Sequence, residues 1–213
     1  MLTTRRIVTL ATLCAIALVA PLAGQRPSAW LDASVGAGSG AQRVAASAWR
    51  PVVTLAGRVH LGFGARVSAY AGDPTDYTNR GTVQGNLTSK FTIDPAVYAI
   101  NAGVFGELSL GGPVAVGANL DLLGWATGPT RTAGALVAKP QAGSYFQYGS
   151  ADHGALNSEF FASLRVAPRV RVRVGLSHYV TDYTVTDTAA AAAPSSRYQR
   201  FETTPFVAVA VRL

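Results

Sequence analysis

The strongest constraint on the fold of this chain is an alternation of polar and apolar residues with a period of two. The clearest case is the segment 169–179, where the odd positions are polar or small and the even positions are Val or Leu. The segments 113–126 and 206–213 repeat the pattern. Successive side chains of a strand point to opposite faces of the sheet, so each segment predicts a strand with one polar and one apolar face.

Turn residues sort the predicted strands into hairpins. Short connections rich in Gly or Pro are expected at 61–64, 109–112 and 167–168, and longer polar connections at 38–47, 72–90, 128–157 and 187–197. We therefore predict eight strands, over 29–37, 48–60, 63–72, 92–108, 113–127, 158–166, 169–184 and 198–213. Short turns would share one end of the molecule and long loops the other.

Composition and charge decide which face of these strands points outward. Only 14% of the 213 residues are charged against 49% hydrophobic, well below the roughly 25% charged residues of an ordinary soluble domain. The apolar faces are rich in Ala and Val, which suit a lipid-facing surface better than a globular core. The polar faces carry charges of both signs, which we expect to pair inside the barrel: Asp32, Arg50, Arg58, Arg66, Glu107, Asp121, Glu159, Arg165, Arg171, Arg173 and Glu202. The sequence thus predicts an all-β fold, an eight-stranded antiparallel up-and-down transmembrane β-barrel.

The N-terminal segment is expected to be an export signal. Arg5 and Arg6 precede an uncharged apolar run over 7–22, which is too short to cross a bilayer as a helix. We predict a cleavable signal peptide over 1–24 and the barrel domain over 25–213. The one cysteine, Cys14, allows no internal disulfide and no cysteine-based metal cluster, and we expect neither a metal nor a cofactor.

With these features, the chain resembles the small eight-stranded outer-membrane β-barrel proteins of Gram-negative bacteria. The resemblance rests on the export signal, the alternation of short turns and long loops, the segment 169–179 and the final segment 206–213. It implies location in the bacterial outer membrane, contact with outer-membrane lipid, and recognition of the C-terminal strand by the barrel assembly machinery. The last residue here is Leu213, where that family usually has an aromatic residue.

An eight-stranded barrel has an interior just wide enough for side chains, so paired arginines and carboxylates would fill it. We therefore expect a structural or surface-interaction role with no catalysis. One alternative is a narrow channel for small polar solutes. Another is a lipid A-modifying enzyme, but the outer-membrane lipid A deacylases that share this barrel size use a His and a Ser two residues apart, and His60, His153 and His178 lack that spacing.

Contacts with other molecules are expected in the long loops. Tyr145, Phe146 and Tyr148 lie in a Gly-, Ala- and Ser-rich setting that suits either binding of an extracellular ligand or folding over the barrel mouth. The net charge is +7, but no basic run is interleaved with aromatic residues, so no nucleic-acid partner is expected. Other aromatic residues near predicted strand ends are expected in the headgroup zone or in ordinary packing: Trp30, Trp49, Tyr98, Trp125, Tyr179 and Tyr198.

Overall fold

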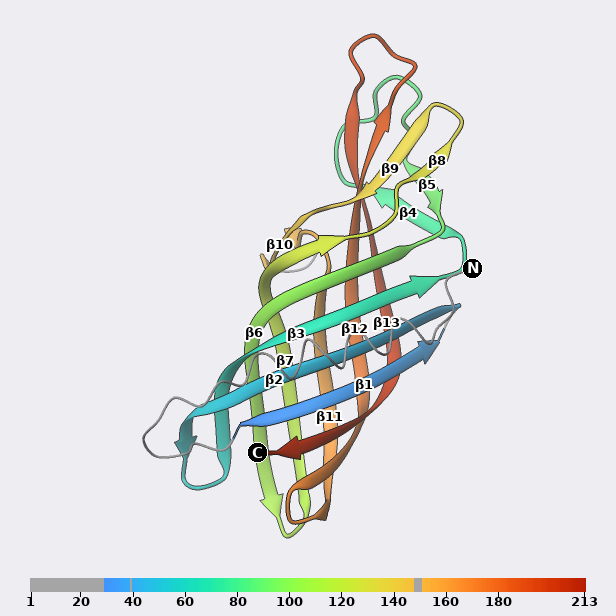
Figure 1. Cartoon of the computed structure of the whole chain (residues 1–213). Coiled ribbons are helices and arrows are strands. Elements are labelled where there is room, and N and C mark those ends of the chain that lie inside the picture. The colour runs from blue at the N-terminus through green and yellow to red at the C-terminus, as the bar shows by residue number, and fades with distance from the viewer. Residues whose placement is uncertain (1–28, 39, 148–150) are drawn as a thin grey trace.

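The computed structural model describes residues 29–38, 40–147 and 151–213, so the predicted signal peptide lies outside the described residues. Eight long strands form a closed ring: β1 (Trp30–Gly38), β2 (Ala41–Leu55), β3 (Val59–Gly72), β6 (Ala96–Gly111), β7 (Val114–Thr127), β11 (Leu156–Ala167), β12 (Val170–Asp187) and β13 (Ser195–Arg212). Each strand pairs antiparallel with its two neighbours, and β13 closes the ring onto β1. The predicted eight-stranded antiparallel up-and-down barrel is confirmed (Figure 1). Among the described residues, no helix has the length and hydropathy needed to span a bilayer.

The predicted pattern of links is confirmed in part. Tight turns join β6 to β7 and β11 to β12, as expected. The turn expected at 61–64 is wrong, because these residues lie inside β3 and the chain instead turns at 56–58, where Ala56 and Gly57 have φ of 47° and 65°. The long loop expected at 38–47 is also wrong, because β2 already begins at Ala41. Pro51 lies at a bulge in β2, where the register shifts between Pro51 and Val53.

Five short strands lie in the long connections: β4 (Thr75–Asn79), β5 (Lys90–Ile93), β8 (Arg131–Ala133), β9 (Leu136–Pro140) and β10 (Gly143–Tyr145). Strand β12 leaves β11 after Val180 and continues with β13 above the ring, where β4 adds to β13 and β9 adds to β12. Figure 1 shows this extension at the top, with β5 and β8 outside β4 and β9. We call the sheet β5-β4-β13-β12-β9-β8 above the ring the cap.

The strand faces have the predicted orientation. On β12, Arg173 is buried inside the ring while Val174 and Leu176 are 51% and 54% exposed outside it. On β13, Ala208 and Ala210 point inward and Val207 points outward. Apolar side chains therefore cover the outside of the ring, and buried charged side chains such as Arg173 lie within it.

Candidate functional site

The inside of the ring holds a layer of buried charges that spans its width. Arg66 on β3 donates from Nη2 to Glu159 Oε2 (2.8 Å) and from Nη1 to Asp121 Oδ1 (3.0 Å). Arg43 on β2 donates to the other oxygen of Glu159, at 3.0 Å. Two arginines and two carboxylates from four strands thus neutralise one another away from water, the condition under which buried charges are tolerated.

Side-chain amides complete the hydrogen bonding of the two carboxylates. Asn101 Nδ2 donates to Asp121 Oδ2, and Asn119 Nδ2 donates to Glu159 Oε2, each at 2.8 Å. Asn157 donates its side-chain amide to Glu159 Oε1 and its backbone N–H to Asp121 Oδ2. Both oxygens of Glu159 and Oδ2 of Asp121 therefore accept two hydrogen bonds each, and Oδ1 of Asp121 accepts one, from Arg66. These hydrogen bonds limit the free-energy cost of burying the carboxylates.

A second layer of charges lies nearer the short turns. Arg173 Nη1 on β12 is 2.6 Å from Asp32 Oδ2 on β1, and its Nη2 is 3.7 Å from Glu107 Oε2 on β6. Arg171 forms a further ion pair with Glu107, and Ser47 donates to Asp32. The two layers place paired charges at two depths of the barrel.

Each arginine of the two layers also lies over an aromatic ring, which adds cation–π attraction and fills space that water would otherwise occupy. The pairs, with the distance from the guanidinium carbon to the ring centroid, are Arg43 over Phe206 (5.8 Å), Arg66 over Phe105 (5.6 Å), Arg171 over Trp30 (4.7 Å) and Arg173 over Phe161 (4.6 Å).

Solvent reaches almost none of these side chains. Arg66, Arg173 and Asp121 are each 1% exposed, and Phe105 is fully buried. The lining of an open aqueous pore would be accessible to water, whereas the charged side chains of these two layers are buried or, like Arg171 at 14%, only slightly exposed.

The structure brings together most of the residues expected in the interior network. Those in the two layers are Asp32, Arg66, Glu107, Asp121, Glu159, Arg171 and Arg173. Glu202 is buried on β13 and pairs with Arg200 at 2.7 Å. Arg43, which the sequence reasoning missed, belongs to the first layer.

Three predicted members lie outside this network and are corrected here. Arg50 is exposed because its neighbour Trp49 takes the inward position on β2 and stacks on Phe105. Arg58 is exposed in the turn between β2 and β3. Arg165 is exposed at the end of β11, where a register shift between Arg165 and Ala167 ends the regular pairing with β12.

Aromatic residues of the cap lie over the barrel mouth. Tyr77, Tyr183 and Tyr198 are fully buried, and Tyr77 packs edge-on against Tyr183. The Tyr183 hydroxyl accepts a hydrogen bond from the Ala96 backbone N–H at the start of β6 (3.0 Å), and the Tyr77 hydroxyl bonds Thr181. The cap is therefore a packed sheet attached to the ring and not a set of separate loops.

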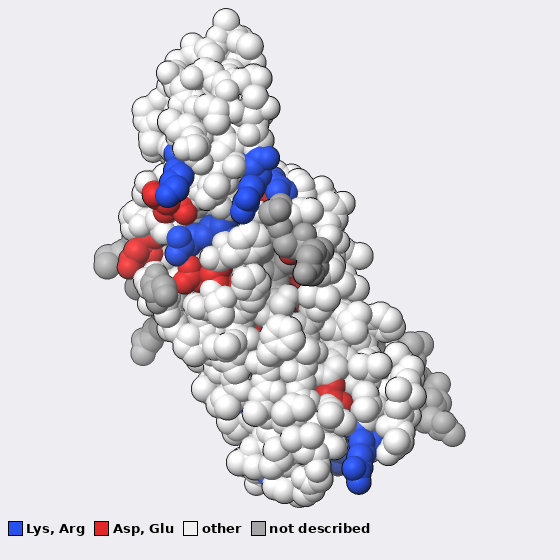
Figure 2. All heavy atoms as spheres, turned by 180° about the vertical axis from the view of Figure 1, so that it is seen from behind, with Lys and Arg blue, Asp and Glu red and all other residues white. Residues whose placement is uncertain are grey.

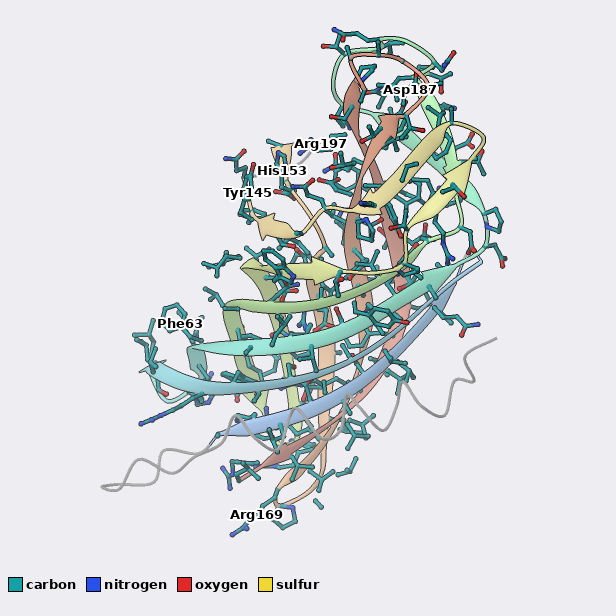
Figure 3. The ribbon with its side chains drawn as sticks, turned by 45° about the horizontal axis from the view of Figure 1, so that its top comes forward. Phe63, Tyr145, His153, Arg169, Asp187 and Arg197 are labelled. Atoms are coloured by element: carbon teal, nitrogen blue, oxygen red, sulfur yellow. The ribbon has the colours of Figure 1, made fainter. Side chains whose placement is uncertain are left out.

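A polar cluster lies beside the cap, where Tyr145 and His153 form an isolated antiparallel β-bridge. Tyr145 stacks on His153 with ring centroids 4.4 Å apart, and both lie near Arg197 in Figure 3. Asp182 accepts the Gly154 N–H (3.0 Å) and lies 3.5 Å from Arg197 Nη1. Burial raises the pKa of Asp182 to about 7, although Arg197 acts in the opposite direction.

The predicted loop contacts fall in this region. Tyr145 and Phe146 are 41% and 37% exposed, and Tyr148 lies outside the described residues. Of the aromatic residues expected near strand ends, Tyr98 and Trp125 are exposed on the outer face. The other four are buried, three inside the ring (Trp30, Trp49 and Tyr179) and Tyr198 in the cap.

A serine and a histidine are adjacent on β12 but lie on opposite faces of the strand. Ser177 is buried and donates to Asn157 Oδ1 (2.6 Å), whereas His178 points outward and stacks on Phe201. Side chains on opposite faces of one strand cannot exchange a proton. Within residues 29–38, 40–147 and 151–213, no three His, Cys, Asp or Glu side chains are placed to hold a metal ion.

Comparisons with known proteins concern the fold. No protein-family model matches the chain, and no curated protein matches it. The chain is similar to the crystal structure of Neisserial surface protein A, with 15% identity and a TM-score of 0.45, over 87% of this chain and 95% of that one. It is also similar to a major outer membrane protein from Thermus thermophilus, with 12% identity and a TM-score of 0.40, over 87% of this chain and 99% of that one.

Proposed function

We propose that this chain is a non-conducting β-barrel of the bacterial outer membrane, with a structural or surface-interaction role and no catalysis. The observation that carries the membrane assignment is the combination of an apolar outer face with a charged, water-excluded interior. Phe160, Leu176 and Trp125 are 65%, 54% and 60% exposed on three different strands of the ring. A soluble barrel has the reverse orientation, and soluble monomers rarely expose apolar patches beyond a few hundred Å².

Closure of the sheet supports the same proposal. A bilayer core offers no hydrogen-bond partners, so strands can cross it only when every edge is paired. The seam between β1 and β13 is paired from Trp30 with Arg212 to Gly36 with Phe206. Recognition of β13 by the assembly machinery remains a prediction from the sequence.

The non-conducting character is inferred from the interior. Two layers of ion pairs, each with arginines over aromatic rings, occupy the positions that would line a channel. For a small polar solute to pass, ion pairs such as that of Arg66 with Glu159 would have to break. The narrow channel is therefore only the second candidate.

The surface role is inferred from residues beside the cap. Tyr145, at the end of β10, and Phe146, directly after it, are 41% and 37% exposed, and exposed aromatic residues are typical of a contact surface. These side chains are the part of the chain that we propose for binding an extracellular ligand.

Two measurements test the proposal. Detergent-extracted protein should migrate faster on a gel before boiling than after it, because a closed membrane barrel resists unfolding in cold detergent. Purified protein in a planar bilayer should give no discrete conductance steps. A single migration rate, or steady openings that persist when the cap is mutated, would contradict the membrane barrel or its non-conducting character, respectively.

A further inference from the structure

The exposed charges are distributed unequally between the two ends of the barrel. Five arginines are exposed at the short-turn end of the ring: Arg58 and Arg169 in turns, Arg165 and Arg212 near strand ends, and Arg50 on β2 beside Trp49, the partner of Trp30 at the start of β1. The exposed acids among the described residues are Asp73, Asp76 and Asp94, and all three lie in the long connections at the opposite end. Figure 2 shows both signs of charge on the upper part of the visible face, and near the lower end a blue patch with a smaller red patch just above it.

The acids nearest the short turns are not available to these arginines. Asp32 and Glu107 are buried inside the ring, where they pair with Arg173 and Arg171. The exposed surface at this end therefore carries five positive side chains and no exposed carboxylate side chain among the described residues.

Three of the arginines form a cluster at the turn between β11 and β12. Arg169 lies in this turn, and its carbonyl accepts the backbone N–H of Arg212 at 2.8 Å. Arg165 Nη2 donates to the Gly112 carbonyl at 2.9 Å, which uses one of its five N–H donors and fixes the position of the guanidinium. Figure 3 shows Arg169 at the lower extremity of the molecule, far from His153 and Asp187 of the loop end.

A groove of about 480 Å³ lies at this turn. It is lined by Arg165, Val166, Ala167, Pro168 and Arg212. The lining therefore combines two arginines with apolar residues of the turn, and Val166 is 56% exposed. A ligand that fits such a lining has an anionic head next to an apolar chain.

We infer that the arginine cluster at the short-turn end binds the headgroups of anionic phospholipids in the adjoining leaflet. This inference rests on the proposed membrane location. Arginine presents a planar fork of donors that matches the oxygens of a phosphate group, and a surface of one charge sign gains most from lipids of the opposite sign. The apolar turn next to the cluster accommodates the start of the acyl chains.

The test uses the full chain refolded into phosphatidylcholine vesicles that contain a spin-labelled lipid, either phosphatidylglycerol or phosphatidylcholine. The fraction of label immobilised by the protein gives the relative association of the two lipids. We expect phosphatidylglycerol to be favoured roughly fivefold, the effect of about one neutralised charge, and the preference to shrink in high salt. The double variant Arg165→Gln, Arg212→Gln should bring the ratio close to one.

A matched pair at the other end of the molecule is the control. Arg80 and Lys90 are also exposed, and the double variant Arg80→Gln, Lys90→Gln changes the net charge by the same amount. It should retain the wild-type lipid preference. Equal losses in the two double variants, or no preference in the wild type, would overturn the inference in favour of an unspecific charge effect.

The same samples separate this inference from the proposed function. Wild-type protein that fails to insert, and shows no heat-dependent gel shift, contradicts the membrane barrel itself. Protein that inserts and shifts but does not discriminate between the lipids contradicts only the lipid site. The gel shift also shows that each variant has folded before its lipid preference is compared.

Discussion

Arg66 and Glu159 form an ion pair across the interior of the barrel, with Arg66 Nη2 2.8 Å from Glu159 Oε2. Their strands β3 and β11 are not neighbours in the ring, because β6 and β7 lie between them. Backbone hydrogen bonds connect only adjacent strands, so this ion pair connects two strands that the hydrogen bonding of the sheet does not connect. The Arg43 contact with Glu159, from β2, acts in the same way.

Replacing Glu159 by Gln should destabilise the barrel strongly. The change leaves Arg43 and Arg66 buried with only Asp121 to neutralise them, and removing one partner of a buried ion pair costs about 3–5 kcal/mol. The measurement is the free energy of unfolding in urea for protein inserted in vesicles, followed by tryptophan fluorescence. Glu202→Gln is the control, because Arg200 is 26% exposed and the loss should be smaller. Equal losses would contradict the cross-barrel role of Glu159.

Gly117→Ala should destabilise the barrel by overpacking its interior. A Cβ at Gly117 would lie 2.4 Å from Phe161 Cζ and 2.6 Å from the Gly106 carbonyl oxygen. Phe161 would have to move from beneath Arg173, at a cost of about 1–3 kcal/mol. The heat-dependent gel shift should therefore occur at lower temperature.

Gly106→Ala is the matched control for this substitution. Its Cβ would lie 3.2 Å from the end of the Leu61 side chain, which is flexible and can move away. The unfolding temperature should stay close to that of the wild type. A larger loss at Gly106 than at Gly117 would mean that the Phe161 ring does not limit the space in the interior.

The contact of Asp182 with the backbone N–H of Gly154 should weaken as pH rises. The pKa of Asp182 is raised to about 7 by burial, whereas in the unfolded chain it is near 4. The folded state therefore holds the proton more tightly, and its stability falls between about pH 4 and pH 7. Hydrogen exchange at the Gly154 amide, corrected for intrinsic rates, should show roughly tenfold or greater loss of protection between pH 5 and pH 8.

Two variants identify the group responsible. Asp182→Asn should remove the decrease in protection. His153 has the opposite effect on how protection changes with pH. Burial and then Arg197 lower its pKa below 6.5, so the folded state favours the neutral ring and gains stability as pH rises. His153→Asn should therefore steepen the decrease, and a pH response that survives in Asp182→Asn would exclude Asp182 as its source.

Asp187 should hold the 80–88 segment against the cap. Its Oδ2 accepts both the backbone N–H of Asn86 (2.9 Å) and the side-chain amide of Asn86 (3.0 Å). These bonds, the backbone bond first, lower the pKa of Asp187, so the contact is lost only as pH falls through a value below the ordinary one near 4.

Asp187→Ala should therefore expose the Asn86 amide to hydrogen exchange at neutral pH. Thr188→Ala is the control, because Thr188 bonds the Ala135 carbonyl of another connection and does not touch Asn86. If the Asn86 amide stays protected in Asp187→Ala, the segment is held by its other contacts.

The sequence predicted the parts of the fold in which polarity alternates strictly. On β12 and β13, Arg173 and Ala208 point inward and Val174 and Val207 outward, as expected. The start of β2 was missed because both faces of the strand carry small residues there, such as the neighbours Ala45 and Ala46. Neither face is therefore recognisable as the polar one. Arg43 was lost from the predicted network with it.

The misplaced turn has a different physical reason. Gly62 and Gly64 suggested a bend, but a Cβ at Gly62 would lie 2.0 Å from the Arg50 carbonyl oxygen, and one at Gly64 would lie 2.5 Å from Trp49 Cβ. These glycines permit close packing inside a strand. The presence of glycine does not show whether a segment forms a turn or a closely packed strand. That depends on the strand pairing, which connects residues that are not adjacent in the sequence.

The unbroken passage of β12 and β13 from the ring into the cap has a mechanical consequence. The two strands stay paired from Val170 with Val211 to Thr186 with Ser195, and seven residues of β12 beyond Val180 rise about 23 Å at the usual strand spacing. Nothing along this ladder offers a hinge. A force applied to the tip of the cap would consequently act on the same backbone hydrogen bonds between β12 and β13 that close the ring. The cap and the ring should therefore bend together.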